Sequence, residues 1–295
     1  MRSSHNFLLC LFLPLFSSCI SAQNYSAEYI DEAIPFSLHQ PSLQMNLPYA
    51  LAEISGLEYF EGHLLAVQDE AGTIFYIHPQ AGRIEKKLLL FGEGDAEGVA
   101  SNGETLFLNT SDGLIFGKAP RVKEDVQLLG ASLPAGGDYE ALTWDKTART
   151  LLIATKDNLK GDDYPGKNRY IFSVEATAPF SHELFLTIDY KLLKTYLQVD
   201  DKDIIHYANL QAEYDKPKPS GLAIDPLTGL IYIVNDSGKM LLVYTRDGSL
   251  KALALLGDRL FAKPEGIAFD PEGNLYISNE QKTSPANILF FKRQR

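Results

Sequence analysis

The chain has 295 residues, of which 45% are hydrophobic and 22% are charged, which is the composition of a folded globular protein with room for a large core. Its formal net charge is −11 at pH 7, so an acidic surface argues against nucleic acid as a partner. Only two cysteines are present, and Cys10 lies in a segment that we expect to be removed, so an internal disulfide and a cysteine zinc site are excluded from the mature chain.

Residues 1–18 have the pattern of a signal peptide. Arg2 provides a short positive start, and ten apolar residues from Phe7 to Phe16 follow, which is too short a run to span a bilayer as a mature helix. The run ends before Ser17-Ser18-Cys19, which resembles a bacterial lipobox, although Phe16 stands where Leu is usual. We therefore predict lipidation of Cys19, with cleavage after Ala22 as the alternative. In both cases the protein is exported, and a lipid anchor would be its only attachment to a membrane.

Residues 19–33 are polar, show no clear period and are predicted to form a linker, whereas residues 34–295 are predicted to form the folded domain. At the start of that domain, hydrophobic and polar residues alternate from Ser42 to Leu47. This alternation predicts a single strand that has no partner nearby in the sequence.

A short motif then recurs along the chain, in which a Ser or Glu precedes a Gly or Ala and an apolar strand. Its copies begin at Ser55, Glu97, Glu140, Ser220 and Glu265, at spacings of 42, 43, 80 and 45 residues. A turn and two further apolar strands follow each copy, and some units show a fourth strand. Units of about 40–45 residues with four antiparallel strands are typical of β-propeller blades. The sequence therefore predicts an all-β propeller.

Five blades are favoured over six. The interval of 80 residues is explained by a long loop at 157–168 and by an insertion at 189–217 with a short helix near Tyr190–Leu197. A degenerate sixth blade in this interval is the alternative. Because the last unit ends after its third strand, we predict that the strand at 42–47 completes that blade and closes the ring, which removes exposed sheet edges.

The motif residues are predicted to form a ring, because the inner strand of each blade lies along the central channel. Glu97, Glu140 and Glu265 would repel one another there unless they were protonated or bridged by a cation. Their hard oxygen ligands would suit Ca²⁺ better than zinc or copper. The alternative is that these carboxylates pair with Lys218, Lys263 or backbone N–H groups.

Several stretches resemble the SdiA-regulated family of bacterial envelope propellers, over roughly residues 45–292. They are Glu53-Ile54-Ser55-Gly56-Leu57, Asp69-Glu70, Gly94-Asp95-Ala96-Glu97-Gly98, Pro219-Ser220-Gly221-Leu222-Ala223 and Pro264-Glu265-Gly266-Ile267-Ala268. The resemblance implies a five-bladed propeller that is distantly similar to NHL-repeat propellers and has a calcium site, but it implies no established activity. The ligands it implies are Glu97, Glu140 and Glu265, with Glu53 and Glu280 as weaker candidates.

Taken together, these features predict a binding or interaction module in the bacterial cell envelope, facing the periplasm or the cell surface. Its partner would be an unidentified small molecule or envelope protein. The alternative is a calcium-dependent hydrolase, because Pro264–Pro271 is also similar to lactonase and phytase propellers. In that case the metal would polarise a carbonyl or phosphoryl oxygen, and Asp95 or Asp138 would act as the base.

Overall fold

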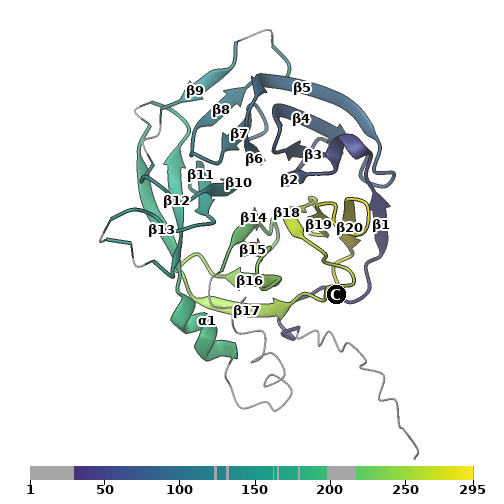
Figure 1. Cartoon of the computed structure of the whole chain (residues 1–295), viewed down its shortest axis with the longest axis vertical. Coiled ribbons are helices and arrows are strands. Elements are labelled where there is room, and N and C mark those ends of the chain that lie inside the picture. Colours follow the sequence, from purple (N-terminus) through teal and green to yellow (C-terminus); the bar gives the residue numbers. More distant parts are fainter. Residues whose placement is uncertain are drawn as a thin grey trace, which may run out of the picture.

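The structure is a computed structural model in which five four-stranded antiparallel sheets form a ring of blades within the described residues (Figure 1). These residues are 30–122, 125–130, 133–161, 163–164, 166–178, 180–197 and 217–294. The predicted signal peptide and Cys19 lie outside them. The prediction of an all-β propeller with five blades is confirmed.

Each of the first four blades is a sequential meander that runs from the channel to the rim. Blade 1 consists of β2 (Ile54–Phe60), β3 (His63–Gln68), β4 (Ala71–Ile77) and β5 (Ile84–Glu93). Blade 2 consists of β6 (Ala96–Ser101), β7 (Leu106–Thr110), β8 (Ile115–Lys118) and β9 (Gln127–Leu129). Blade 3 consists of β10 (Tyr139–Asp145), β11 (Thr150–Thr155), β12 (Arg169–Glu175) and β13 (His182–Ile188). Blade 4 consists of β14 (Pro219–Ile224), β15 (Ile231–Asn235), β16 (Met240–Tyr244) and β17 (Leu250–Leu255).

The fifth blade joins the two ends of the chain. It contains β18 (Pro264–Phe269), β19 (Leu275–Asn279), β20 (Asn287–Phe291) and, on the outside, β1 (Leu43–Asn46). β1 runs antiparallel to β20, with Met45 opposite Ile288, and Met45 is buried. The predicted closure of the ring by the N-terminal strand is confirmed.

Helical structure is limited to η1 (Tyr49–Leu51) and α1 (Tyr190–Leu197) in the described part of the chain. The predicted helix at Tyr190–Leu197 is confirmed, and its Leu193 is buried in the core between blades 3 and 4. Neither helix combines the length and the apolar character that crossing a bilayer requires. Before β1, the chain packs against blades 4 and 5, where Phe36 contacts Tyr232 and Phe269 in a buried aromatic cluster.

Candidate functional site

The five inner strands, β2, β6, β10, β14 and β18, surround the channel, and each contacts the next until β18 meets β2 (Figure 1). In every blade the register between the inner and second strands shifts at the repeated motif. Such a β-bulge bends the strand and changes the direction in which a side chain points. The motif is therefore first of all architectural, because it marks the place where each inner strand bends.

The glycine of the motif permits neighbouring inner strands to pack closely. A Cβ on Gly98 would lie 2.4 Å from Asn109 Oδ1 and 2.7 Å from Leu142 Cβ, and one on Gly266 would lie 2.6 Å from Leu57 Cβ. Leu142 and Leu57 belong to the inner strands of the next blades around the ring. In these blades the glycine is thus needed where two inner strands approach each other, whereas blade 3 has Ala141 at this position.

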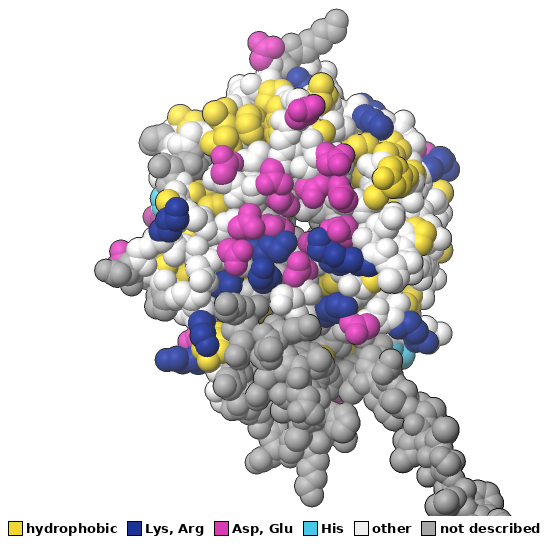
Figure 2. Space-filling view, viewed as in Figure 1, with side chains coloured by type: hydrophobic (Ala, Val, Ile, Leu, Met, Phe, Trp, Pro, Cys, Tyr) yellow, Lys and Arg dark blue, Asp and Glu magenta, His cyan; other side chains and the backbone are white. Residues whose placement is uncertain are grey.

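Three positions in each blade bring charged side chains to the end of the channel where the inner strands begin, a surface that we call the charged mouth. The motif supplies Ser55, Glu97, Glu140, Ser220 and Glu265. The first residue after each second strand supplies Asp69, Ser111, Lys156, Asp236 and Glu280. The residue two before the motif supplies Glu53, Asp95, Asp138, Lys218 and Lys263. Nine carboxylates therefore face three lysines, and acidic side chains gather around the centre of the ring in Figure 2.

Lys156 lies between carboxylates of two blades, Glu140 and Asp236. Its Nζ donates to Glu140 Oε2 at 2.7 Å and lies 3.5 Å from Asp236 Oδ2. Burial alone would lower the pKa of Lys156, but Glu140, Glu265 and Asp236 raise it well above its ordinary value. The ammonium is therefore charged throughout the neutral range.

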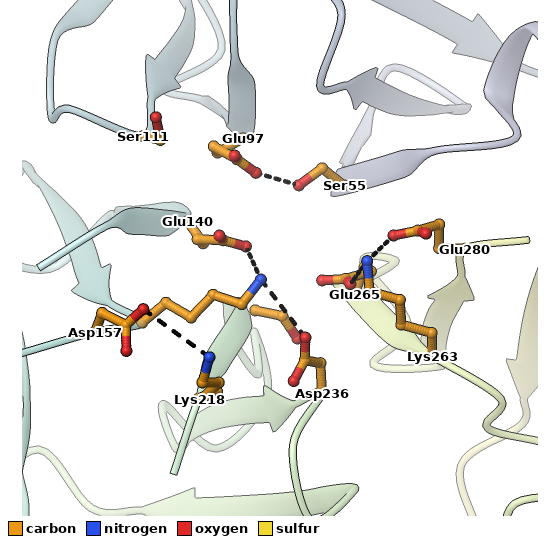
Figure 3. A network of polar contacts seen from close by, with 12 residues as sticks. Ser55, Glu97, Ser111, Glu140, Asp157, Lys218, Asp236, Lys263, Glu265 and Glu280 are labelled. Carbon is orange, nitrogen blue, oxygen red and sulfur yellow. Dashed lines mark hydrogen bonds and ion pairs between the residues drawn. The ribbon is translucent and has the colours of Figure 1, made fainter. Parts of the chain in front are cut away.

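Glu265 is the most deeply buried carboxyl of the charged mouth, with only 2% of its surface exposed. Its Oε1 lies 3.1 Å from Lys263 Nζ, and Glu280 contacts the same ammonium (Figure 3). Neither Glu265 oxygen has a hydrogen-bond partner among the described residues. Burial raises the pKa of Glu265 to about 8, against the opposing effect of Lys156 and Lys263, so this carboxyl is largely protonated at pH 7.

Glu97 differs from the other two motif carboxyls because no ion pair reaches it within the described residues. Its Oε2 accepts a hydrogen bond from Ser55 Oγ at 2.8 Å. Burial, followed by the repulsion of Glu140, raises the pKa of Glu97 well above its usual range. Glu97 is therefore a neutral carboxyl at pH 7 that can still ionise if a positive charge comes close.

Glu53 lies further out on the charged mouth. Asp69 and then burial raise the pKa of Glu53, since the two carboxyls repel each other and share a hydrogen bond. A cavity of about 290 Å³ opens beside it, lined by Tyr49, Glu70 and Glu280 among others. Of the five residues predicted as metal ligands, Glu140, Glu265 and Glu280 contact Lys156 or Lys263. Glu97 accepts a hydrogen bond from Ser55 instead, and Glu53 lies further out on the charged mouth.

The arrangement of the carboxylates does not by itself indicate a calcium site. Among the described residues no group of three or more His, Cys, Asp or Glu side chains is placed to hold a metal. The Lys156 ammonium instead supplies positive charge where Glu140 and Asp236 converge. The calcium ion stays a prediction. The alternative to a metal was that the carboxylates pair with Lys218 or Lys263. Glu265 does pair with Lys263, but Glu140 pairs with Lys156, and Lys218 lies 3.9 Å from Asp157.

The sequence analysis missed Lys156, the residue around which the charged mouth is organised. A signal for it exists in the sequence. Aligning the residue that follows the second strand of each blade places Lys156 in line with Asp69, Asp236 and Glu280, so a cation stands among acids at one repeated position. Which carboxylates it would reach depends on packing across blades, which a repeat does not reveal.

The comparisons with known proteins agree with this fold. The family model described as SdiA-regulated matches residues 190–291. The resemblance to that family is confirmed over this stretch. A search of curated protein sequences found no match.

Three solved structures show how widely the fold is shared. The glutaminyl cyclase of Myxococcus xanthus is 16% identical, with a TM-score of 0.55 over 86% of this chain and 96% of that chain. The PQQ-bound aldose sugar dehydrogenase of Streptomyces coelicolor is 12% identical, with a TM-score of 0.50 over 90% of this chain and 98% of that chain. A chain of a nidogen/laminin complex is 14% identical, with a TM-score of 0.50 over 77% of this chain and 72% of that chain. At these identities the likeness establishes the propeller fold alone.

Proposed function

We propose that the protein is an exported β-propeller binding module that captures a small organic cation, an amine, at its charged mouth. The excess of nine carboxyl groups over three lysines carries this proposal, because the seven besides Glu97 and Glu265 still outnumber the lysines when those two are protonated. Negative groups gathered in a concave site concentrate the field and attract cations. The same excess disfavours phosphate, nucleic acid and acidic peptides as ligands.

Lys156 shows that the ring stabilises an ammonium group. Its Nζ is held by carboxylates from blades 3 and 4, and its side chain is only 14% exposed. Glu97 and the Oε2 atom of Glu265 have no comparable cationic partner among the described residues. A second ammonium, brought by a ligand, would ion-pair with these two carboxyls and make charge-assisted hydrogen bonds to them.

The 290 Å³ cavity beside Glu53 offers room for the rest of such a ligand. Tyr49, in its lining, is 86% exposed, and an exposed aromatic ring beside carboxylates attracts cations through its π face. A diamine would therefore place one ammonium over the inner carboxyls and the other near Glu53 and Glu70. A linear diamine carries an ammonium at each end and is therefore the form of amine that we propose.

Export and anchoring complete the proposal. The apolar run at 7–16 and the lipobox-like Ser17-Ser18-Cys19 support delivery to the bacterial envelope with Cys19 as the lipidated residue. Metabolic labelling with an alkyne fatty acid tests this step: labelling of the natural chain that disappears in Cys19→Ala is expected. Equal labelling of both chains, or none of either, contradicts the anchor.

Calorimetry with butane-1,4-diamine tests the ligand class. We expect saturable binding that weakens about 10-fold or more in Glu97→Gln and in Glu265→Gln, since each loses one ion pair. Lys156→Met should bind the diamine more tightly, because the competing internal ammonium is gone. Glu183→Gln, an exposed change on β13, serves as the control. Absence of diamine binding in all forms would refute the proposal.

Calcium chloride and a panel of lactones and phosphoesters are titrated in the same series. Calcium binding by the natural chain that is lost in Glu97→Gln would favour the calcium site predicted from the sequence. Turnover that chelation abolishes would favour the hydrolase. Diamine binding without turnover is the result that the proposal expects.

A further inference from the structure

A second cavity lies at the opposite end of the channel, where the inner strands finish. Its volume is about 680 Å³, and residues near the ends of β2, β6, β10, β14 and β18 all line it. Pockets that bind small molecules typically measure about 300–1,000 Å³. We call this cavity the far pocket, since the length of the inner strands separates it from the charged mouth.

Aromatic rings form part of its lining. Tyr59 and Trp144 are partly exposed there, and Phe269 also lines the pocket. Trp144 is stacked on Phe107, with 6.0 Å between ring centroids and an interplanar angle of 12°, and Tyr59 packs against Tyr276 at 6.2 Å. These neighbours fix the planes of both rings, so the aromatic surface is rigid before any ligand binds.

The charges of the far pocket differ from those of the charged mouth. Glu61 pairs with Arg121, and Asp270 accepts hydrogen bonds from Asn274 N and Nδ2, both at 2.8 Å. These hydrogen bonds come from a neutral residue, so Asp270 keeps its charge, and the other charged groups of the lining are Glu58 and Lys146. Because Lys146 offsets one of these carboxyls, the negative excess of the far pocket is small compared with that of the charged mouth.

Glu58 is able to both donate and accept hydrogen bonds. Its Oε1 accepts from Tyr59 N at 2.8 Å. Burial raises the pKa of Glu58 to about 7, against the opposing effects of the Tyr59 backbone and Lys146. Protonated and ionised forms are thus both present near neutral pH. The Ser101 and Thr143 hydroxyls in the lining also donate and accept.

We propose that the far pocket binds a neutral saccharide of one or two rings. Flat aromatic surfaces cover the apolar faces of such a ring, and groups that donate and accept at once match its hydroxyls, which do the same. The small net charge favours the neutral sugar: the carboxyls disfavour an acid derivative, and Lys146 disfavours an amine. This site is independent of the amine site, because it lies at the other end of the channel and selects a ligand without charge.

Trp144 is the single tryptophan of the chain, so its fluorescence reports directly on the far pocket. The protein is titrated with glucose, galactose, mannose, N-acetylglucosamine and maltose. For the tightest-binding sugar the amine and acid analogues are added, as glucosamine and glucuronate are for glucose. We expect a saturable emission change with a neutral sugar and about 10-fold weaker binding of both charged analogues. No saturable change with any neutral sugar, or tighter binding of a charged analogue, would overturn the proposal.

Variants of Glu58 locate the interaction. Glu58→Gln keeps a donor and an acceptor and should hold the sugar within about 3-fold of the natural affinity, whereas Glu58→Ala should lose about 10-fold. Thermal unfolding of each variant checks that the propeller is intact, and Glu183→Gln on the outer strand β13 provides an unaffected control. Equal sugar affinity in Glu58→Ala and the natural chain would show that the sugar binds elsewhere and would refute the site.

Discussion

Replacing Lys156 with Met removes the cation at the centre of the charged mouth while keeping most of the side-chain volume. Lys156 and Glu140 are 14% and 7% exposed, so the carboxylates left behind are poorly solvated. Removing one of the two charged side chains of a buried ion pair lowers the free energy of unfolding by about 3–5 kcal/mol. Because Glu140 is able to take up a proton instead, we expect the lower figure, about 3 kcal/mol at pH 9, where protonation is least favourable.

The dependence on pH distinguishes this electrostatic effect from lost packing. Burial raises the pKa of Glu140, whereas Lys156 holds it down, so the variant raises that pKa further. A carboxyl with a raised pKa stabilises the fold at low pH, and the contribution is lost as the pH rises through the folded value. The cost of Lys156→Met should therefore fall to about 1 kcal/mol at pH 6 and grow towards pH 9.

Urea unfolding at pH 6 and pH 9 measures both numbers. The double variant Lys156→Met/Glu140→Gln should recover most of the loss at pH 9, since a neutral amide replaces the stranded carboxylate. Lys251→Met, at an exposed position on β17, should change the unfolding free energy by less than about 0.5 kcal/mol. An equal cost of Lys156→Met at the two pH values would refute the electrostatic reasoning.

Three further predictions concern the ring and its closure. Gly98→Ala should cost about 1–3 kcal/mol of unfolding free energy because its Cβ would clash with β10, whereas Gly92→Ala, which meets nothing within 4 Å, should be close to neutral in the same urea titration. Met45→Ala should cost about 2–4 kcal/mol by thermal or urea unfolding because it removes buried packing from the closing strand β1, and the exposed Gln44→Ala is its control; equal costs would argue against closure by β1. Glu97→Gln should stabilise the fold at pH 9 by about 1–2 kcal/mol and leave it unchanged at pH 5, because it removes a buried carboxyl with a raised pKa; destabilisation at pH 9 would contradict the assignment.

The fold was predictable because the repeat records it locally. Spacing, strand composition and the glycine of the motif are dictated by one blade and its neighbour, so five copies indicate the ring. The lone alternating strand at 42–47 was equally informative, since a blade that lacks its fourth strand requires a partner for β20.

The candidate site was only partly predictable. The ring formed by Glu97, Glu140 and Glu265 followed from the repeat, but its partner Lys156 did not, because side chains from different blades meet only in the assembled ring. The far pocket was missed for a related reason: Glu58 and Trp144 lie in inner strands and look like core residues, and their exposure to a cavity depends on how the five strand ends splay apart.

Proton release on binding of butane-1,4-diamine tests the central claim most directly. At pH 7 the carboxyls of Glu97 and Glu265 are largely neutral because burial raises both pKa values. A bound ammonium favours their ionised forms, so binding should release about one to two protons per ligand, measured by calorimetry in two buffers of different ionisation enthalpy. Glu97→Gln/Glu265→Gln should release none. Binding to the natural chain without proton release would contradict the account, because the cation would then not reach these carboxyls.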